Sequence, residues 1–257
     1  MKFKLLILLL LLISGSALAA KPSVTTAVPV VDLIAQALLE KTPVQVLYLP
    51  PKRLPINRIP AWLNSVGSNE LAVTDAVLTV ESVSRGLAIF SLLRQKNIRL
   101  VAIDLAQEIT PKGAGITQRQ GINEPDYFWL DTNNLLLMVN IAARDLARLW
   151  PEYAKQINHN RGEVLRQIQQ LALQVDELLL LANINSLALS DEKLMPMAQV
   201  TILPLVEVDV ADLVLSTQTE AGKKTWVIDP LLRPSAKTLE AWLESVVVSL
   251  QQALIEQ

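Results

Sequence analysis

Few side chains in this 257-residue sequence can carry out chemistry, and their scarcity excludes several kinds of site. The chain has no cysteine and a single histidine, His159. Without cysteine there is no disulfide framework, thiolate metal cage, iron–sulfur cluster or cysteine nucleophile. One imidazole excludes a zinc site built on two histidines, and any serine–histidine–aspartate triad would have to use His159.

Serines and glycines also lack the settings that catalytic and phosphate-binding motifs require. No serine lies within a Gly-x-Ser-x-Gly sequence, which forms the nucleophile turn of many hydrolases. Gly113-Ala114-Gly115 lacks the third glycine of a dinucleotide-binding loop and has no strand immediately before it. We therefore expect that the protein is not an enzyme.

Charged side chains are sparse and nearly balanced. The sequence has 23 basic and 25 acidic residues, and 51% of its residues are hydrophobic. This composition is typical of a folded chain rather than a disordered one, and it predicts no basic surface for nucleic acid. The cluster of Lys52, Arg53 and Arg58 would hold a small anion or an acidic partner if its loop faced a cleft; a solvated surface cluster is the alternative.

The N-terminus has the three parts of a secretory signal. Lys2 and Lys4 precede an apolar run over residues 5–13, and small residues end in Ala-Leu-Ala at 17–19. The run is shorter than the roughly 20 residues that a membrane-spanning helix needs, although a short anchor is an alternative. We expect residues 1–19 to be removed on export. A cysteine-free mature chain then fits the periplasm, soluble and without a lipid anchor or transmembrane segment.

Short apolar strands alternate with helices in the first half of the mature chain. The expected strands cover residues 23–28, 44–49, 76–80 and 99–103. The expected helices cover residues 29–40, 60–66 and 86–96. This alternation is typical of a parallel sheet with both faces covered. The segment 110–123 contains three of the eight glycines and is expected to be a loop.

A long helix is expected to follow. Asp131, Thr132 or Asn133 can cap a helix that runs to about residue 150, and Pro151 can begin the next helix. The helical spacing of apolar residues then continues to residue 181, so roughly 30 residues would span about 45 Å, more than a small domain. His159 lies off the apolar stripe of this helix and is expected to face solvent.

The rest of the chain predicts a second, smaller α/β unit. Its expected strands cover residues 186–189, 200–203, 213–215 and 225–228, before a closing helix at 234–255. The sequence therefore predicts an α/β fold of two small lobes with parallel sheets. We expect these lobes at residues 20–150 and 183–257, joined by one rigid interlobe helix at 151–182.

Several segments occur in an order that is informative as a whole. They are residues 24–33, residues 49–60 with Pro50-Pro51, residues 125–134 with Trp129-Leu130-Asp131, the long helix, and residues 227–231. In this order they resemble the periplasmic metal-binding proteins of zinc and manganese ABC importers. The resemblance covers nearly the whole mature chain, and it implies a metal site held by four side chains between two lobes.

The two histidine positions of that family are altered in this sequence. The first family histidine follows a proline; here Pro55 is followed by Ile56, which cannot bind a metal, and then by Asn57, which offers only a weak carbonyl oxygen. The second lies two residues before Trp129, where this sequence has Tyr127. A tyrosine phenol has a pKa near 10 and is a poor ligand unless a metal lowers it.

The two acidic positions are retained. The resemblance places the third ligand after Ser190, where this sequence has Asp191, and the fourth before Pro230, where it has Asp229. Either residue also has a structural alternative, because Asp191 can cap the following helix and Asp229 can simply end a strand. The histidine-rich loop of the family would fall within residues 110–123, which contain no histidine, aspartate or glutamate.

The resemblance thus implies an oxygen-rich site with Asp191, Asp229 and Tyr127 as metal ligands. Zinc prefers nitrogen and sulfur donors, whereas manganese accepts oxygen donors, with water completing the set. We expect a monomeric protein that binds a divalent ion, manganese or zinc, and delivers it to an ABC importer permease. The alternative is an interaction protein that keeps the fold, has lost the ion and docks on a transporter or another periplasmic partner.

Overall fold

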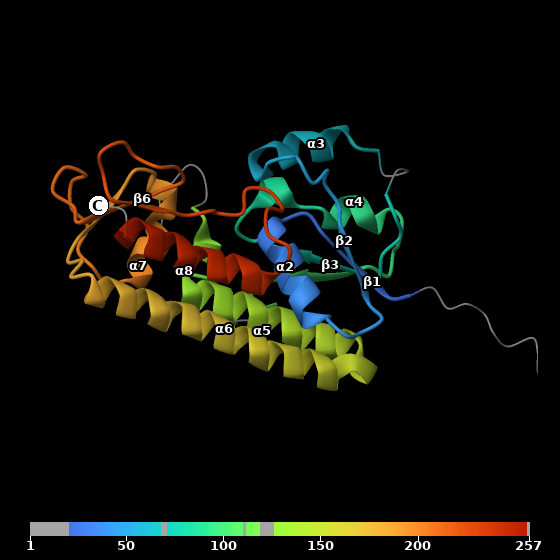
Figure 1. Cartoon of the computed structure of the whole chain (residues 1–257). Coiled ribbons are helices and arrows are strands. Elements are labelled where there is room, and N and C mark those ends of the chain that lie inside the picture. The colour runs from blue at the N-terminus through green and yellow to red at the C-terminus, as the bar shows by residue number, and fades with distance from the viewer. Residues whose placement is uncertain (1–20, 68–70, 110–111, 119–125, 256–257) are drawn as a thin grey trace, which may run out of the picture.

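Two parallel sheets flanked by helices organise the chain (Figure 1). The computed structural model describes residues 21–67, 71–109, 112–118 and 126–255. The signal sequence expected at 1–19 and parts of the loop expected at 110–123 lie outside the described residues.

The first sheet has four parallel strands in the order β2-β1-β3-β4. These strands are β1 (Ser23–Thr26), β2 (Gln45–Tyr48), β3 (Ala76–Thr79) and β4 (Val101–Asp104). The helices between them are α2 (Pro29–Leu38), α3 (Ile59–Ser65) and α4 (Phe90–Arg94). The central strands β1 and β3 bury every residue, as expected for a parallel sheet covered on both faces. Residues 21–150 are called the first lobe below.

Two antiparallel helices form the base of the molecule (Figure 1). Asp131 caps α5 (Thr132–Leu149) by accepting a hydrogen bond from the Asn133 N–H at 2.8 Å. After a short 3-10 helix that begins at Pro151, α6 (Ala154–Leu181) continues for 28 residues, about 42 Å. Helix α6 packs against α5 and α2 and also against the last helix, so it contacts both halves of the chain.

The second sheet has three parallel strands in the order β5-β6-β7. Its strands are β5 (Leu187–Leu189), β6 (Leu213–Ser216) and β7 (Thr225–Val227), and its helices are α7 (Met195–Val200) and α8 (Leu239–Ile255). Residues 183–255 are called the second lobe below. The predicted α/β fold with two parallel sheets and one long helix between them is confirmed.

The strand predicted at residues 200–203 is wrong. Val200 ends α7, which begins at Met195, has Pro196 in its first turn and buries Met197. The chain then turns at Ile202, whose φ of 58° is incompatible with a strand. Only afterwards does the backbone pair, through a single parallel bridge between Leu205 and Leu187. β-branched residues favour strands, but burial of one face of α7 decides this segment.

One hydrophobic cluster runs through both lobes and α6. Its large, fully buried side chains include Phe128 in the first lobe and Trp226 and Trp242 in the second. In the part of the chain that the structure describes, no helix is both long and apolar enough to cross a membrane.

Asn160 ties α6 to the end of α2. Its side-chain amide donates hydrogen bonds to the carbonyls of Leu38 at 2.9 Å and Glu40 at 2.8 Å, and the residue is only 7% exposed. The last carbonyls of a helix have no partner within the helix, so Asn160 supplies donors that α2 lacks.

We expect Asn160→Leu to lower the free energy of unfolding by about 2 kcal/mol, because two largely buried acceptors lose their donor. Urea unfolding followed by circular dichroism measures this loss. Gln156→Ala is the matched control, since Gln156 only donates to the Asn160 side chain at 2.8 Å. An equal loss in both variants would contradict this role of Asn160.

Candidate metal site between the lobes

The turn at residues 229–232, which follows β7, accepts hydrogen bonds from the first lobe. The Pro230 carbonyl accepts a hydrogen bond from the Trp129 indole nitrogen at 3.1 Å. Two residues later, the Leu232 carbonyl accepts from the Ile56 N–H at 2.8 Å. The structure therefore brings the first and fourth positions implied by the resemblance, Ile56 and Asp229, to the same boundary between the lobes.

The segments that carry the second and third positions are hydrogen-bonded to each other. The Tyr127 N–H donates to the carbonyl of Lys193, two residues after Asp191, at 3.2 Å. The Tyr127 ring is half-buried, and its centroid lies 5.9 Å from that of Trp129. Among the described residues, however, no three histidine, aspartate or glutamate side chains are close enough to hold one ion.

Asp191 acts as a helix cap. It precedes the 3-10 helix Glu192–Leu194, and its Oδ1 accepts a hydrogen bond from the Lys193 N–H at 2.9 Å. Capping interactions of this kind stabilise a helix start because the first N–H groups have no internal partner. The capping alternative is therefore confirmed for Asp191, and it occupies one of its two carboxylate oxygens.

Asp229 is exposed, and both of its carboxylate oxygens accept hydrogen bonds. Oδ1 accepts from the Leu231 N–H at 2.9 Å, and Oδ2 accepts from the Ser235 hydroxyl at 2.5 Å. Leu231 is fully buried with a φ of 54°, the left-handed region that leucine rarely adopts. Asp229 thus stabilises the strained turn that contacts the first lobe.

Ile56 lies in a short 3-10 helix, Ile56–Arg58, and its partly buried side chain packs against the core. An apolar side chain therefore occupies the position of the first family histidine. Lys52, Arg53 and Arg58 around it are all exposed, as the solvated alternative for this cluster predicts. On α6, His159 is also exposed, which confirms its predicted orientation.

A buried carboxyl group that the sequence reading missed lies near these loops. Asp32, in the first turn of α2, is 5% exposed. Its Oδ2 accepts from the Gln36 amide at 2.6 Å, whereas its Oδ1 is buried and has no hydrogen-bond partner within the described ranges. Burial raises the pKa of Asp32 to about 6, partly offset by the Gln36 hydrogen bond and the charge of Lys52.

The nearby end of β2 carries a second buried group. The Tyr48 hydroxyl also lacks a hydrogen-bond partner among the described residues. Burial raises the pKa of this phenol, and the charge of Asp32 raises it further. An apolar run such as Pro29-Val30-Val31-Asp32 is the one sequence signal that could have indicated a buried carboxyl group.

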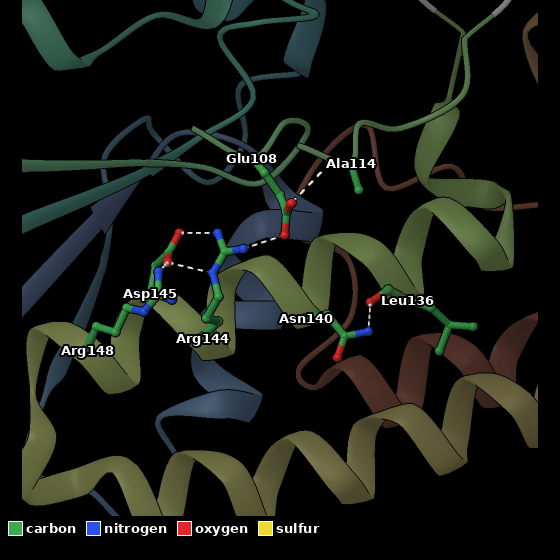
Figure 2. Close-up of polar contacts among 7 residues, drawn as sticks. All are labelled: Glu108, Ala114, Leu136, Asn140, Arg144, Asp145 and Arg148. Atoms are coloured by element: carbon green, nitrogen blue, oxygen red, sulfur yellow. Dashed lines mark hydrogen bonds and ion pairs between the residues drawn. The ribbon is translucent and has the colours of Figure 1, made fainter. Parts of the chain in front are cut away.

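Hydrogen bonds and an ion pair hold the described part of the glycine-containing loop against α5 (Figure 2). The Glu108 N–H donates to the Ala114 carbonyl at 2.9 Å, and the Glu108 carboxylate accepts from the Ala114 N–H at 3.0 Å. Glu108 also forms an ion pair with Arg144, which in turn contacts the Asp145 carboxylate at 2.8 and 2.9 Å. Glu108 and Arg144 lie 36 positions apart, so no local pattern predicts this contact.

We expect Arg144→Met to speed cleavage of this loop by trypsin at the exposed Lys112, because Glu108 loses its cation and the loop loses its link to α5. Cleavage rates followed by mass spectrometry measure the effect. Arg148→Met is the matched control, since Arg148 donates to Asp145 at 3.4 Å and has no hydrogen bond to the part of the loop that the structure describes. Equal rates in the two variants would show that the ion pair does not hold the loop.

Comparisons with known proteins bear on the fold. No family model matches the sequence. No curated protein matches it either. Among solved structures, ZnuA superposes with a TM-score of 0.62 at 16% sequence identity, over 90% of this chain and 98% of that one.

Two further similar structures are of proteins with a bound metal ion. The solute-binding protein FpvC from Pseudomonas aeruginosa, in complex with Mn²⁺, has a TM-score of 0.66 at 13% identity, over 91% of this chain and 97% of that one. A zinc-bound variant of AdcAII from Streptococcus pneumoniae has a TM-score of 0.65 at 11% identity, over 92% of this chain and 98% of that one. The chain therefore has the fold of these proteins, which confirms the resemblance at the level of the fold.

Proposed function

We propose that the protein is the exported solute-binding component of an ABC importer for a divalent ion of the manganese or zinc type. The observation that supports this function best is the set of hydrogen bonds that connects the segments carrying the four implied ligand positions across the boundary between the two lobes. In this proposal a membrane permease is the partner, and the periplasm is the compartment.

The proposed ion site is rich in oxygen. Asp191 can offer Oδ2, because only its Oδ1 accepts the capping hydrogen bond. Tyr127 can offer its phenol oxygen. Asp229 can offer its carboxylate oxygens, although both accept hydrogen bonds, from the Leu231 N–H and the Ser235 hydroxyl. A metal would have to reorient these carboxylates to reach bonds near 2.2 Å. Manganese suits such a set better than zinc, and water would complete its coordination.

The test is a calorimetric titration of the chelator-stripped protein with manganese and with zinc. We expect micromolar binding, weakened tenfold or more in Asp191→Ala with Asp229→Ala, because both charged ligands are removed. Asp176→Ala with Asp209→Ala removes the same charge at exposed positions outside the site and is the matched control. Binding that survives in the Asp191/Asp229 variant would refute this site.

The second candidate, an interaction protein that has lost the ion, is favoured by specific observations. Ile56 and Tyr127 stand where histidines are implied, and Asp191 and Asp229 both serve as local hydrogen-bond acceptors. A ligand that binds only the folded state must raise the melting temperature. This candidate therefore predicts no shift with either ion, whereas the first predicts a rise that depends on ion concentration.

A further inference from the structure

Three backbone carbonyls of the turn at residues 229–232 accept hydrogen bonds from donors in different parts of the chain. The Asp229 carbonyl accepts from the Trp242 indole at 2.9 Å, within the second lobe. The Pro230 and Leu232 carbonyls accept from Trp129 and Ile56, which both belong to the first lobe. The turn is thus fixed to α8 on one side and to two first-lobe segments on the other.

The shape of the turn depends on a conformation that must be held in place. Leu231 sits in the left-handed region and is 0% exposed, so its side chain is anchored in the core while its backbone reverses direction. The Asp229 carboxylate accepts the Leu231 N–H, and Ser235 holds the same carboxylate. Strained residues persist only where surrounding contacts over-determine them.

We propose that this turn clasps the two lobes together without any ion, and that Ile56 and Trp129 are the positioning residues that replace a bridging metal. Trp129 is 4% exposed, and its hydrogen bond to Pro230 is buried. Buried hydrogen bonds of this kind are costly to leave unmade. The Ile56 side chain adds apolar packing where the resemblance implies an imidazole.

The clasp has a consequence for partner binding, which rests on the proposed function. If the lobes are held together permanently, the surface that both lobes present to a permease exists in the ion-free protein. Docking is then independent of the ion, and an ion adds no change in the distance between the lobes.

The interlobe distance tests the clasp directly. Because the chain has no cysteine, Asn64→Cys and Thr219→Cys allow one spin label on an exposed position of each lobe. Pulsed electron paramagnetic resonance on the mature chain, treated with chelator and then with diamagnetic zinc, gives the distance distribution. We expect one narrow distribution that zinc does not shift. A broad or longer distribution that contracts with zinc would overturn the clasp.

Two variants test the assigned residues. Trp129→Phe removes the indole donor to Pro230 and is expected to add a longer-distance population. Trp242→Phe removes a donor to the same turn within one lobe and should leave the distribution narrow. Ile56→Pro provides a second test, because proline is tolerated at the first position of a helix and removes both the N–H that donates to Leu232 and the isoleucine side chain that packs against the core. Narrow distributions in both Trp129→Phe and Ile56→Pro would overturn the roles of these residues.

A calorimetric titration of the labelled protein separates the two proposals. A narrow distribution without zinc or manganese binding supports the clasp and refutes the ion-delivery function. Binding accompanied by contraction of the distance supports ion delivery and overturns the clasp. Binding with no change in distance supports both.

Discussion

Restoring the two implied histidines, with Ile56→His and Tyr127→His together, is expected to raise zinc affinity roughly 1,000-fold, on the order of 4 kcal/mol. The two imidazoles would join Asp191 and Asp229 to give the mixed nitrogen and oxygen set that zinc prefers. Histidine keeps the backbone N–H of residue 56, so the hydrogen bond to Leu232 remains available. Competition against a zinc-binding dye, with melting curves in parallel, measures the gain.

The matched control is Ile56→Gln with Tyr127→Gln, which brings polar side chains of similar size but no imidazole. We expect little gain in zinc affinity from this pair. Adding Asp229→Ala to the double-histidine protein should abolish most of the gain, because the fourth ligand is lost. If the double-histidine and double-glutamine proteins bind zinc equally well, the four positions do not converge on one ion.

Asp32→Asn is expected to stabilise the protein at neutral pH, by up to about 3 kcal/mol. Burial raises the pKa of this carboxyl from its ordinary value of 3.8 to about 6, so the folded state binds the proton more tightly than the unfolded state does. A shift of about two pKa units corresponds to roughly 3 kcal/mol. The contribution is fully present below pH 3.8 and is lost as the pH rises through about 6. Asparagine is neutral at every pH and avoids this loss.

Urea unfolding at intervals between pH 4 and pH 8 measures the effect. The wild-type protein should lose this part of its stability as the pH rises from 4 to 6, and Asp32→Asn should remove that component. The side-chain amide oxygen of the introduced asparagine can still accept the hydrogen bond that Gln36 donates to the Asp32 carboxylate. Asp176→Asn, on the exposed face of α6, changes the same chemical group without changing its burial and is the control. A neutral-pH stability of Asp32→Asn at or below that of the control would contradict the assignment.

Much of the fold could be predicted from local pattern because its central strands are buried on both faces. Residues 24–26 and 76–79 are continuous runs of apolar or β-branched residues, and a parallel sheet buried on both faces favours such runs. The helical spacing that ends near Leu181 likewise reflects one buried stripe on α6. At residues 200–203 the local signal failed, because contacts of Met197 and Ala198 with the core favour the helix that ends there.

The site was predictable only in part. The positions Tyr127, Asp191 and Asp229 came from the order of segments, and the structure places them along one boundary. The hydrogen bond from Trp129 to Pro230 was not predictable, since the two residues are separated by 101 positions. A left-handed leucine at position 231 carries no sequence signal, because the surrounding contacts and not its residue type determine it.

The continuity of the hydrophobic cluster through α6 bears on how the chain unfolds. Leu171 and Val175 on this helix belong to the same cluster as Val24 in the first sheet and Trp226 in the second. A second lobe cut away from α6 would expose apolar surface that has no other cover. We therefore expect the two sheets to melt as one cooperative unit, and a destabilising change in either sheet to lower the resistance of the whole chain to proteolysis.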